Sequence, residues 1–406
     1  MHLLPLLTVA IAAGVLYAIN RRLGGLPATI GVTVWALLAS LALVAAGALG
    51  SPVHEFARRL VARVNFRETL LDGMLSLLLF AGALEVDLDA LLGEKALVAL
   101  LATVGVVIST AIVGGLTLLV ARVCGLPINL QESLLFGAII SPTDPIAVLG
   151  MLRTARAPKQ LEVQMAGESL FNDAVGVVVF FAILEIAAGR TVGAGAISLS
   201  FLEEVGGGAA LGLGAGWIAR KLLRSIDRDR TRARVPLAVL VTLAIAVGLN
   251  LLAERLHGSG YLAVIIAGLM LGGLRAASGL RHFWEVVDEI LNVVLFTMVG
   301  FEVLVIPFNA RVLGAGLLAI PVVLLARLAV VGGTLVPFAR RLSLPPRSIA
   351  ILTWGGLRGG LAIALALSLG PEVPAASILL AMTYVVVLFS IVVQGLTFRR
   401  LLPPPT

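Results

Sequence analysis

The chain has 406 residues, of which 59% are apolar and only 13% are charged, and its mean hydropathy is +1.07. Soluble globular proteins carry about 25% charged residues, so this chain has too few charges to coat a water-facing surface, which excludes that class. The net charge of +7 does not indicate nucleic-acid binding, because only 5% of the residues are aromatic and the basic residues form short clusters between apolar stretches.

Thirteen stretches are apolar enough to be predicted as membrane-spanning helices, since a hydrocarbon layer about 30 Å thick needs roughly 20 apolar residues. They lie near 3–19, 28–49, 69–86, 96–120, 132–152, 161–187, 200–219, 236–253, 260–274, 284–304, 312–338, 347–369 and 375–397. No basic leader precedes the first stretch, so we expect a retained helix rather than a signal peptide. The sequence therefore predicts an all-α polytopic membrane protein with one transmembrane domain over 1–406.

Basic residues between the predicted spans alternate as the positive-inside rule requires. With the N-terminus outside, most of the 30 Lys and Arg fall in cytoplasmic segments, including 153–159, 220–234 and 340–347. The main exception is 53–67, whose helical spacing of apolar residues predicts an amphipathic helix on the membrane surface. We expect a multi-pass protein of the cell (inner or plasma) membrane, with its N-terminus outside and its C-terminus in the cytoplasm.

Two predicted spans contain helix-breaking sequence at their centres: Ser-Pro-Thr-Asp-Pro at 141–145 in the fifth, and Trp-Gly-Gly-Leu-Arg-Gly-Gly at 354–360 in the twelfth. If the seventh span is a linker, both are the fifth member of a six-helix unit, and the two units have opposite orientations in the bilayer. The expected divisions are a first repeat over about 1–190, a linker helix over about 196–222 and a second repeat over about 235–402. Interrupted helices at matching positions of inverted repeats indicate the binding site of a transporter.

Five charged residues fall near the middle of predicted spans: Asp144, Glu168, Asp173, Arg327 and Arg358. A charge there costs about 2.5–3.5 kcal/mol on insertion scales, so unpaired charges without a role are not expected. Three carboxylates against two guanidiniums leave one negative charge. A lone carboxylate in low dielectric must take up a proton or hold a cation, and some of the other charges are expected to form structural ion pairs.

The sixth span indicates which carboxylate remains unpaired. Residues four apart share one face of a helix, so Ser169 and Asp173 form one stripe, while Glu168 and Asn172 form the adjacent one. A hydroxyl beneath a carboxylate offers oxygen donors to a hard cation. The broken fifth span adds Asp144 and main-chain carbonyls at 141–143, since the prolines cannot donate to a helical ladder.

Ser-Pro-Thr-Asp-Pro at 141–145, followed by Gly-Glu-Ser-Leu-Phe-Asn-Asp-Ala at 167–174, resembles the NhaP/NHE family of sodium/proton antiporters. Asn292, Phe296 and the stretch 355–359 resemble the same family. The resemblance implies thirteen helices divided into a dimerisation part and a mobile part, in a homodimer. It implies transport without catalysis or a cofactor.

The resemblance also implies roles for single residues. It places Thr143, Asp144, Ser169 and Asp173 around the ion, and pairs Glu168 with Arg327. The Asn172–Asp173 pair resembles the motif of electroneutral exchangers. Many relatives carry an acid at the position of Ala81, so one ligand would be absent here.

We therefore expect exchange of Na⁺, with Li⁺ as an alternative, for H⁺, one for one, by competition at Asp173, in support of pH homeostasis. The expected partners are Na⁺, H⁺, membrane lipid and a second copy of the chain, without nucleic acid. Arg358 is predicted to balance charge where the broken helices cross, against Asp144. Other hypotheses are a K⁺/H⁺ antiporter, a passive cation channel and an intramembrane enzyme. The channel is disfavoured because it needs no proton-competing carboxylate, and the enzyme because no histidine lies within the fifth and sixth spans.

Overall fold

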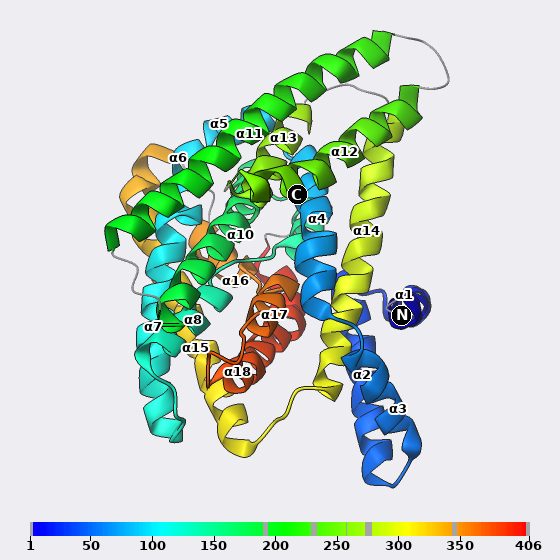
Figure 1. The fold of residues 1–406 in the computed structure, drawn as a ribbon, viewed down its shortest axis with the longest axis vertical. Coiled ribbons are helices and arrows are strands. Elements are labelled where there is room, and N and C mark those ends of the chain that lie inside the picture. The colour runs from blue at the N-terminus through cyan, green and yellow to red at the C-terminus, as the bar shows by residue number, and fades with distance from the viewer. Residues whose placement is uncertain are drawn as a thin grey trace.

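A computed structural model describes residues 3–189, 194–228, 234–256, 258–272, 278–342 and 347–402, and these residues form helices and loops without strands (Figure 1). In the first half of the chain the helices are α1 (Leu3–Ile19), α2 (Ala28–Ala48), α3 (Pro52–Ala62), α4 (Leu75–Glu85), α5 (Leu88–Gly93), α6 (Lys95–Ala102), α7 (Val104–Cys124), α8 (Leu130–Ile140), α9 (Ile146–Thr154) and α10 (Lys159–Ala187).

In the second half they are α11 (Ala194–Arg228), α12 (Arg234–Arg255), α13 (Gly260–Gly272), α14 (Ser278–Phe301), α15 (Ala310–Leu342), α16 (Ser348–Gly355), α17 (Gly360–Leu367), α18 (Ala376–Phe389) and α19 (Gly395–Phe398). A 3₁₀ turn, η3 (Glu302–Leu304), extends α14, and a π-helical turn, η2 (Glu68–Met74), precedes α4. The basic segments predicted at 220–234 and 340–347 lie partly outside the described residues.

Helices occupy all thirteen of the predicted spans within the described residues. Seven helical stretches there are each long and apolar enough to cross a membrane, and α16 with α17, bent by 43°, forms an eighth candidate. The remaining predicted spans coincide with α4, α8 with α9, α11, α13 and α14. The all-α polytopic fold is therefore confirmed.

The amphipathic surface helix predicted at 53–67 is α3, which ends at Ala62. Pro52 occupies its first turn, where a missing N–H costs nothing, and the Ser51 side chain accepts a hydrogen bond from the Val53 amide. None of its residues is buried. Figure 1 shows α3 beside α2 at one end of the molecule, as expected for a helix that covers little of the protein interior.

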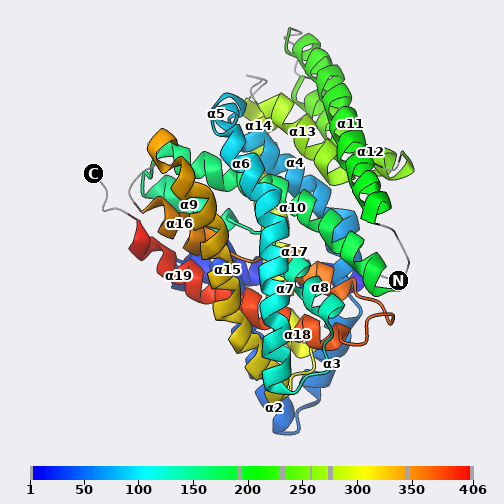
Figure 2. The same ribbon diagram turned by 90° about the vertical axis from the view of Figure 1, so that its left-hand side faces the viewer.

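The helices form two groups. The broken-helix bundle contains α6 to α10 and α15 to α19, in which α7 packs on α8 and α15, and α18 packs on α15 and α17 (Figure 2). The scaffold bundle contains α1, α2, α4 and α11 to α14, in which α13 packs on α4 and α11, and α14 packs on α2. The two bundles meet where α10 contacts α4 and α13, and where α14 contacts α17.

Helix contacts in the scaffold bundle occur in matching pairs. Helix α14 packs on α2 and on α1, and in the same way α4 packs on α13 and on α12; α1 also contacts α2 as α12 contacts α13. These are the contacts expected when the first three spans of one unit correspond to the first three spans of the other. The arrangement agrees with the inverted repeats expected from the sequence.

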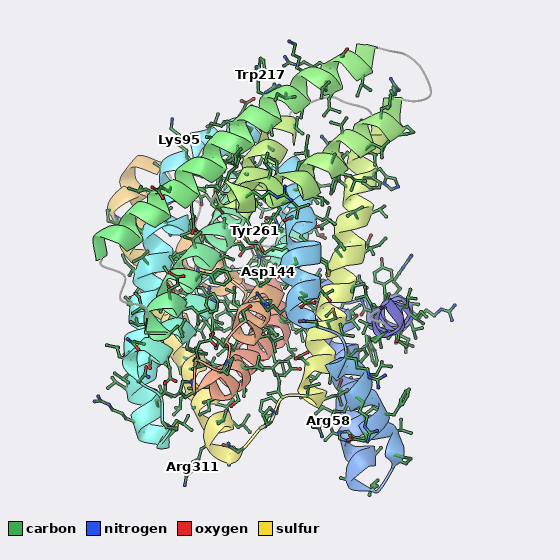
Figure 3. All side chains as sticks on the ribbon, in the orientation of Figure 1. Arg58, Lys95, Asp144, Trp217, Tyr261 and Arg311 are labelled. Atoms are coloured by element: carbon green, nitrogen blue, oxygen red, sulfur yellow. The ribbon has the colours of Figure 1, made fainter. Side chains whose placement is uncertain are left out.

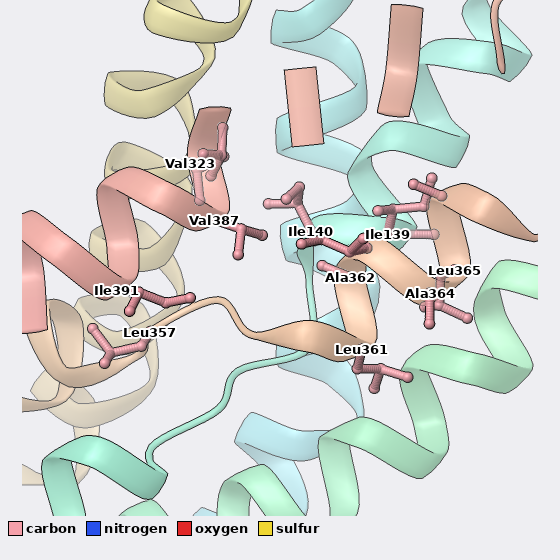
Figure 4. Close-up of a cluster of buried hydrophobic side chains, with 14 of the residues drawn as sticks. Ile139, Ile140, Val323, Leu357, Leu361, Ala362, Ala364, Leu365, Val387 and Ile391 are labelled. Carbon is pink, nitrogen blue, oxygen red and sulfur yellow. The ribbon is translucent and has the colours of Figure 1, made fainter. Parts of the chain in front are cut away.

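The two broken spans meet in the broken-helix bundle. Each consists of two half-helices, α8 with α9 and α16 with α17, joined by non-helical segments at 141–145 and 356–359. The Asp144 amide donates a hydrogen bond of 2.8 Å to the Leu357 carbonyl across the crossing. Figure 4 shows the apolar packing around this point, with Ile140 of α8 near Ala362 of α17. Irregular backbone at membrane depth is thus enclosed by protein, as it must be to stay hydrogen-bonded.

Candidate functional site

A cavity of about 270 Å³ lies between the two bundles, at the break in the fifth span. Its lining includes all four residues expected around an ion: Thr143, Asp144, Ser169 and Asp173. Figure 3 shows Asp144 near the middle of the molecule. Thr143 and Ser169 are buried, whereas both aspartates are half-buried and line the cavity. Two carboxylates and two hydroxyls therefore share one cavity.

The two stripes predicted on the sixth span face different surroundings. Ser169 and Asp173 line the cavity, whereas Glu168 and Asn172 point into the broken-helix bundle, near Arg327 and Arg358. The division follows from the 100° rotation per residue of an α-helix. Asp173 forms no ion pair with an arginine among the described residues, so its carboxylate can take up a proton or a cation.

Asn172 holds the broken segment in place. Its Nδ2 donates to the Thr143 hydroxyl over 2.8 Å, and its Oδ1 accepts from the Thr143 amide over 3.3 Å. The Ser169 hydroxyl donates to the Thr143 carbonyl over 2.5 Å. A side-chain amide can both donate and accept, so it can form hydrogen bonds with the groups that the break in the helix leaves without partners. A carboxylate can only accept, and an apolar side chain can do neither.

Asp144 is oriented by its own helix and by the opposite broken span. Its Oδ1 accepts a hydrogen bond of 3.1 Å from the Ile146 amide at the first turn of α9. Gly359 lies directly beneath the carboxylate, where a Cβ atom would collide with it. Gly176 on α10 likewise leaves room for the Pro142 ring. Glycines at these two positions allow the broken segment to approach both neighbouring helices.

Glu168 and Arg327 form a buried ion pair with two hydrogen bonds, one of them 2.8 Å long between Nη2 and Oε2. Arg327 also donates to the Leu352 carbonyl, through Nη2 over 3.1 Å and Nε over 3.3 Å. This network joins α10, α15 and α16 and lies outside the cavity. It matches the pairing that the family resemblance implies.

Arg358 does not pair with Asp144, so the prediction that these two charges balance each other is wrong. The guanidinium instead donates to the carbonyls of Ser141 and Pro142, over 2.5 and 2.8 Å, and the Arg358 amide donates to Ser390 Oγ over 2.8 Å. Buried carbonyls freed by prolines need donors, and a guanidinium supplies several.

The main-chain carbonyls at 141–143, expected as possible cation ligands, therefore already accept hydrogen bonds from Arg358 and Ser169. The oxygens that remain for a cation are those of the carboxylates and hydroxyls in the cavity.

Ala81 does not face the cavity. It is 2% exposed and packs with Ala263, Ala267 and Trp284 in the scaffold bundle, whereas Gly82 and Glu85 of the same helix line the cavity. An acid at position 81 would point away from the four candidate ligands in this conformation. The sequence does not show which face of α4 meets α10, so this orientation was not predictable.

Asp288 lines the cavity and was not expected there. Near the cavity rim, Arg153 donates to Glu85 over 3.0 Å. The sequence placed Asp288 close to the start of a span, where charges are common, but α14 begins at Ser278 and continues through Asp288 to Phe301. The signal that could have found it is helical spacing, since Asn292 and Leu295 follow on the same face.

The sequence profile of the family described as sodium/hydrogen exchanger, transmembrane, matches residues 7–403. The chain is 42% identical to the Na(+)/H(+) antiporter NhaP of Pseudomonas aeruginosa, in an alignment that covers 94% of this chain and 92% of that relative. It is 34% identical to the Na(+)/H(+) antiporter NhaH of Halobacillus dabanensis, covering 89% and 91%. The structure of the sodium proton antiporter MjNhaP1 from Methanocaldococcus jannaschii is similar in fold, with a TM-score of 0.74 at 20% identity, covering 99% of this chain and 98% of that one. The chain belongs to the sodium/hydrogen exchanger family.

Proposed function

We propose that the protein exchanges Na⁺ for H⁺ across the cell membrane, and that the two compete for Asp173. The observation that carries this proposal is the cavity lined by Asp144, Asp173, Ser169 and Thr143, in which neither carboxylate has a cationic side-chain partner among the described residues. Membership of the sodium/hydrogen exchanger family supports the same reaction.

The donor set suits a hard monovalent cation. Carboxylate and hydroxyl oxygens are the ligands that such ions prefer. A carboxylate held between packed helices, largely out of bulk water, is disfavoured while it is both charged and unpaired. A proton or Na⁺ can relieve that cost at Asp173, but each excludes the other. The two loaded forms then carry the same charge, so the proposed exchange is one for one and electroneutral. The Glu168–Arg327 pair and Asn172 brace the site without binding the ion.

The proposed transport movement carries the broken-helix bundle past the scaffold bundle. The cavity lies between these two groups, so relative sliding can close it on one side and open it on the other. In this proposal the repeats span about 1–190 and 235–402, the helix over about 196–222 links them, and a homodimer forms through the scaffold. With the N-terminus outside and the C-terminus cytoplasmic, the cavity rim with Glu85 and Arg153 faces the cytoplasm.

Exchange in proteoliposomes tests the proposal. Na⁺, Li⁺ and K⁺ gradients are imposed in turn while a pH dye reports proton movement, and a clamped membrane potential is varied in parallel. We expect Na⁺ to drive proton flux, with a rate that does not depend on the potential. Selective response to K⁺ would indicate a K⁺/H⁺ antiporter, rates that change with the potential would contradict electroneutrality, and cation flux without proton flux would contradict exchange.

A further inference from the structure

One face of helix α14 carries polar side chains at its two ends and apolar side chains between them. Asp288, Asn292, Leu295, Val299 and Glu302 follow one another at intervals of four, three, four and three residues. This spacing places them on a single stripe of a helix, and Glu302 begins the 3₁₀ turn that continues it. We call this set the α14 stripe. It begins and ends with a carboxylate.

One end of the stripe faces the cavity. Asp288 and Leu295 both line it. Asn292 lies between them and is 2% exposed. Its side-chain amide lies near the Asp288 carboxylate. Neither the amide oxygen nor the amide nitrogen meets the distance and angle criteria of a hydrogen bond to any described residue. Leaving a buried polar group unsatisfied costs about 1–3 kcal/mol. Asn292 therefore needs a polar neighbour, and the Asp288 carboxylate at the cavity lies beside it.

The middle of the stripe is sealed against the broken-helix bundle. Leu295 occupies the space that a Cβ atom on Gly360 would need. One turn further, Tyr384 of α18 donates a hydrogen bond of 3.0 Å to the Val299 carbonyl, and its ring lies 6.0 Å from that of Phe308. Tyr384 is completely buried. These contacts close the seam between the bundles on the side away from the cavity opening.

Glu302 lies beyond this seal. It is 7% exposed, and its carboxylate has no ion pair or hydrogen bond in the part of the chain that the structure describes. Its turn contacts α2 and α3, so it lies at the membrane face that carries α3, opposite to Asp288. A buried carboxylate without a counter-charge is costly and is by default a sign of function in a membrane protein.

We propose that Glu302 binds the transported cation at the outer entrance when the seal opens, and that Asp288 binds it at the inner entrance. The α14 stripe is then the fixed wall of the ion path, with one carboxylate at each end and the Leu295–Val299 seal between them. Opening the seam between α14 and α18 would expose Glu302 to solvent. The inference rests on the proposed exchange function, because it assigns the two entrances of the same path.

Transport assayed separately from each side tests this assignment. The KM for Na⁺ is measured on the outer and inner faces, in right-side-out and inside-out vesicles, for Glu302→Gln and Asp288→Asn. Glu302→Gln is expected to raise the outer KM about tenfold, as for loss of one ionic contact at a partly hydrated site, and to leave the inner KM unchanged. Asp288→Asn is expected to do the opposite. Glu302→Asp should restore most of the outer affinity.

Glu289→Gln is the matched control, because Glu289 is exposed, lies about 100° from the stripe and binds the Tyr17 hydroxyl instead. It should change neither KM. The proposal would be overturned by a Glu302→Gln variant that folds and exchanges but has the same outer KM as the wild type. An equal increase in the outer and inner KM would also overturn it. Absence of Na⁺/H⁺ exchange in the wild type would instead contradict the proposed function.

Chemical labelling gives a second measurement that does not depend on transport rates. Cys124 is the only cysteine, so Glu302→Cys in a Cys124→Ser background has a single thiol. A membrane-impermeant thiol reagent is expected to label it from the outer face and not from the inner face. Labelling from the inner face, or from neither face, would contradict the assignment.

Discussion

The Asp144 amide is hydrogen-bonded to the Leu357 carbonyl, at 2.8 Å, so a candidate ion ligand in one broken span is tied to the backbone of the other. The same two segments are joined a second time by Arg358, which donates to Ser141 and Pro142. The site therefore depends on how closely the two breaks approach each other. Glycine at the crossing is what permits that approach.

Gly359→Ala should reduce exchange at least about tenfold while the protein remains folded. Its Cβ atom would collide with the Asp144 carboxylate, and displacing a ligand by about 1 Å is enough to cost a large part of activity. Gly333→Ala on α15 is the control, because a Cβ atom there meets nothing within 4 Å. The measurement is Na⁺-driven proton flux at equal reconstituted amounts. Equal rates for both variants would mean that the crossing tolerates displacement of Asp144.

Removing either partner of the Glu168–Arg327 pair should lower stability by about 3–5 kcal/mol, because a buried charge is left uncompensated. Thermal unfolding in detergent of Glu168→Gln and Arg327→Met checks this. The double variant should be more stable than Arg327→Met alone, since neither charge then remains. If the double variant loses as much stability as the two single variants together, the two side chains act independently. The ion pair would then not be the contact that joins α10 to α15.

Asn172→Leu should weaken Na⁺ binding and lower stability by about 1–3 kcal/mol, because the Thr143 amide and hydroxyl lose their partner. Asn172→Asp keeps an acceptor for the Thr143 amide but lacks the Nδ2 donor, so it should have a smaller effect on stability. The KM for Na⁺ and the melting temperature are measured for both. An Asn172→Leu variant with unchanged KM would show that the position of Thr143 does not matter for the ion.

Competition between Na⁺ and H⁺ makes a prediction about pH. Where Asp173 is mostly protonated, the apparent KM for Na⁺ should rise about tenfold for each unit that the pH falls, because one proton must leave for each ion that binds. At high pH the KM should become independent of pH. Ser169→Ala should raise the KM at every pH without changing this slope, since it removes a ligand and not the titrating group. A KM that does not vary with pH would contradict competition.

Much of the fold could be predicted from the sequence because it depends on local properties. Hydropathy gives the spans, and Pro142, Pro145 and the glycines around Arg358 mark the two breaks. Helical periodicity separated Ser169 and Asp173 from Glu168 and Asn172, and the structure places the two stripes in different surroundings.

The rest depends on contacts between distant segments. The face of α4 that meets α10 decides that Ala81 is turned away, and the position of Tyr384 decides where the α14 stripe is sealed. Arg358 was expected to face a carboxylate because the sequence shows charges but not the freed carbonyls that compete for the guanidinium. Asp288 is expected from the sequence to be a solvated residue at a span end, and Glu302 also lies near the end of a predicted span, where charged residues are common; neither position indicates a site by itself.

The most direct test of the account is the Na⁺/H⁺ exchange rate of Asp173→Asn in proteoliposomes, beside the wild type and the Glu289→Gln control. Asparagine preserves the shape of the side chain but cannot carry the exchanged proton or the negative charge. Asp173→Asn is expected to fold and to lack exchange, while the control retains it. An Asp173→Asn variant that exchanges Na⁺ for H⁺ at the wild-type rate would contradict the account.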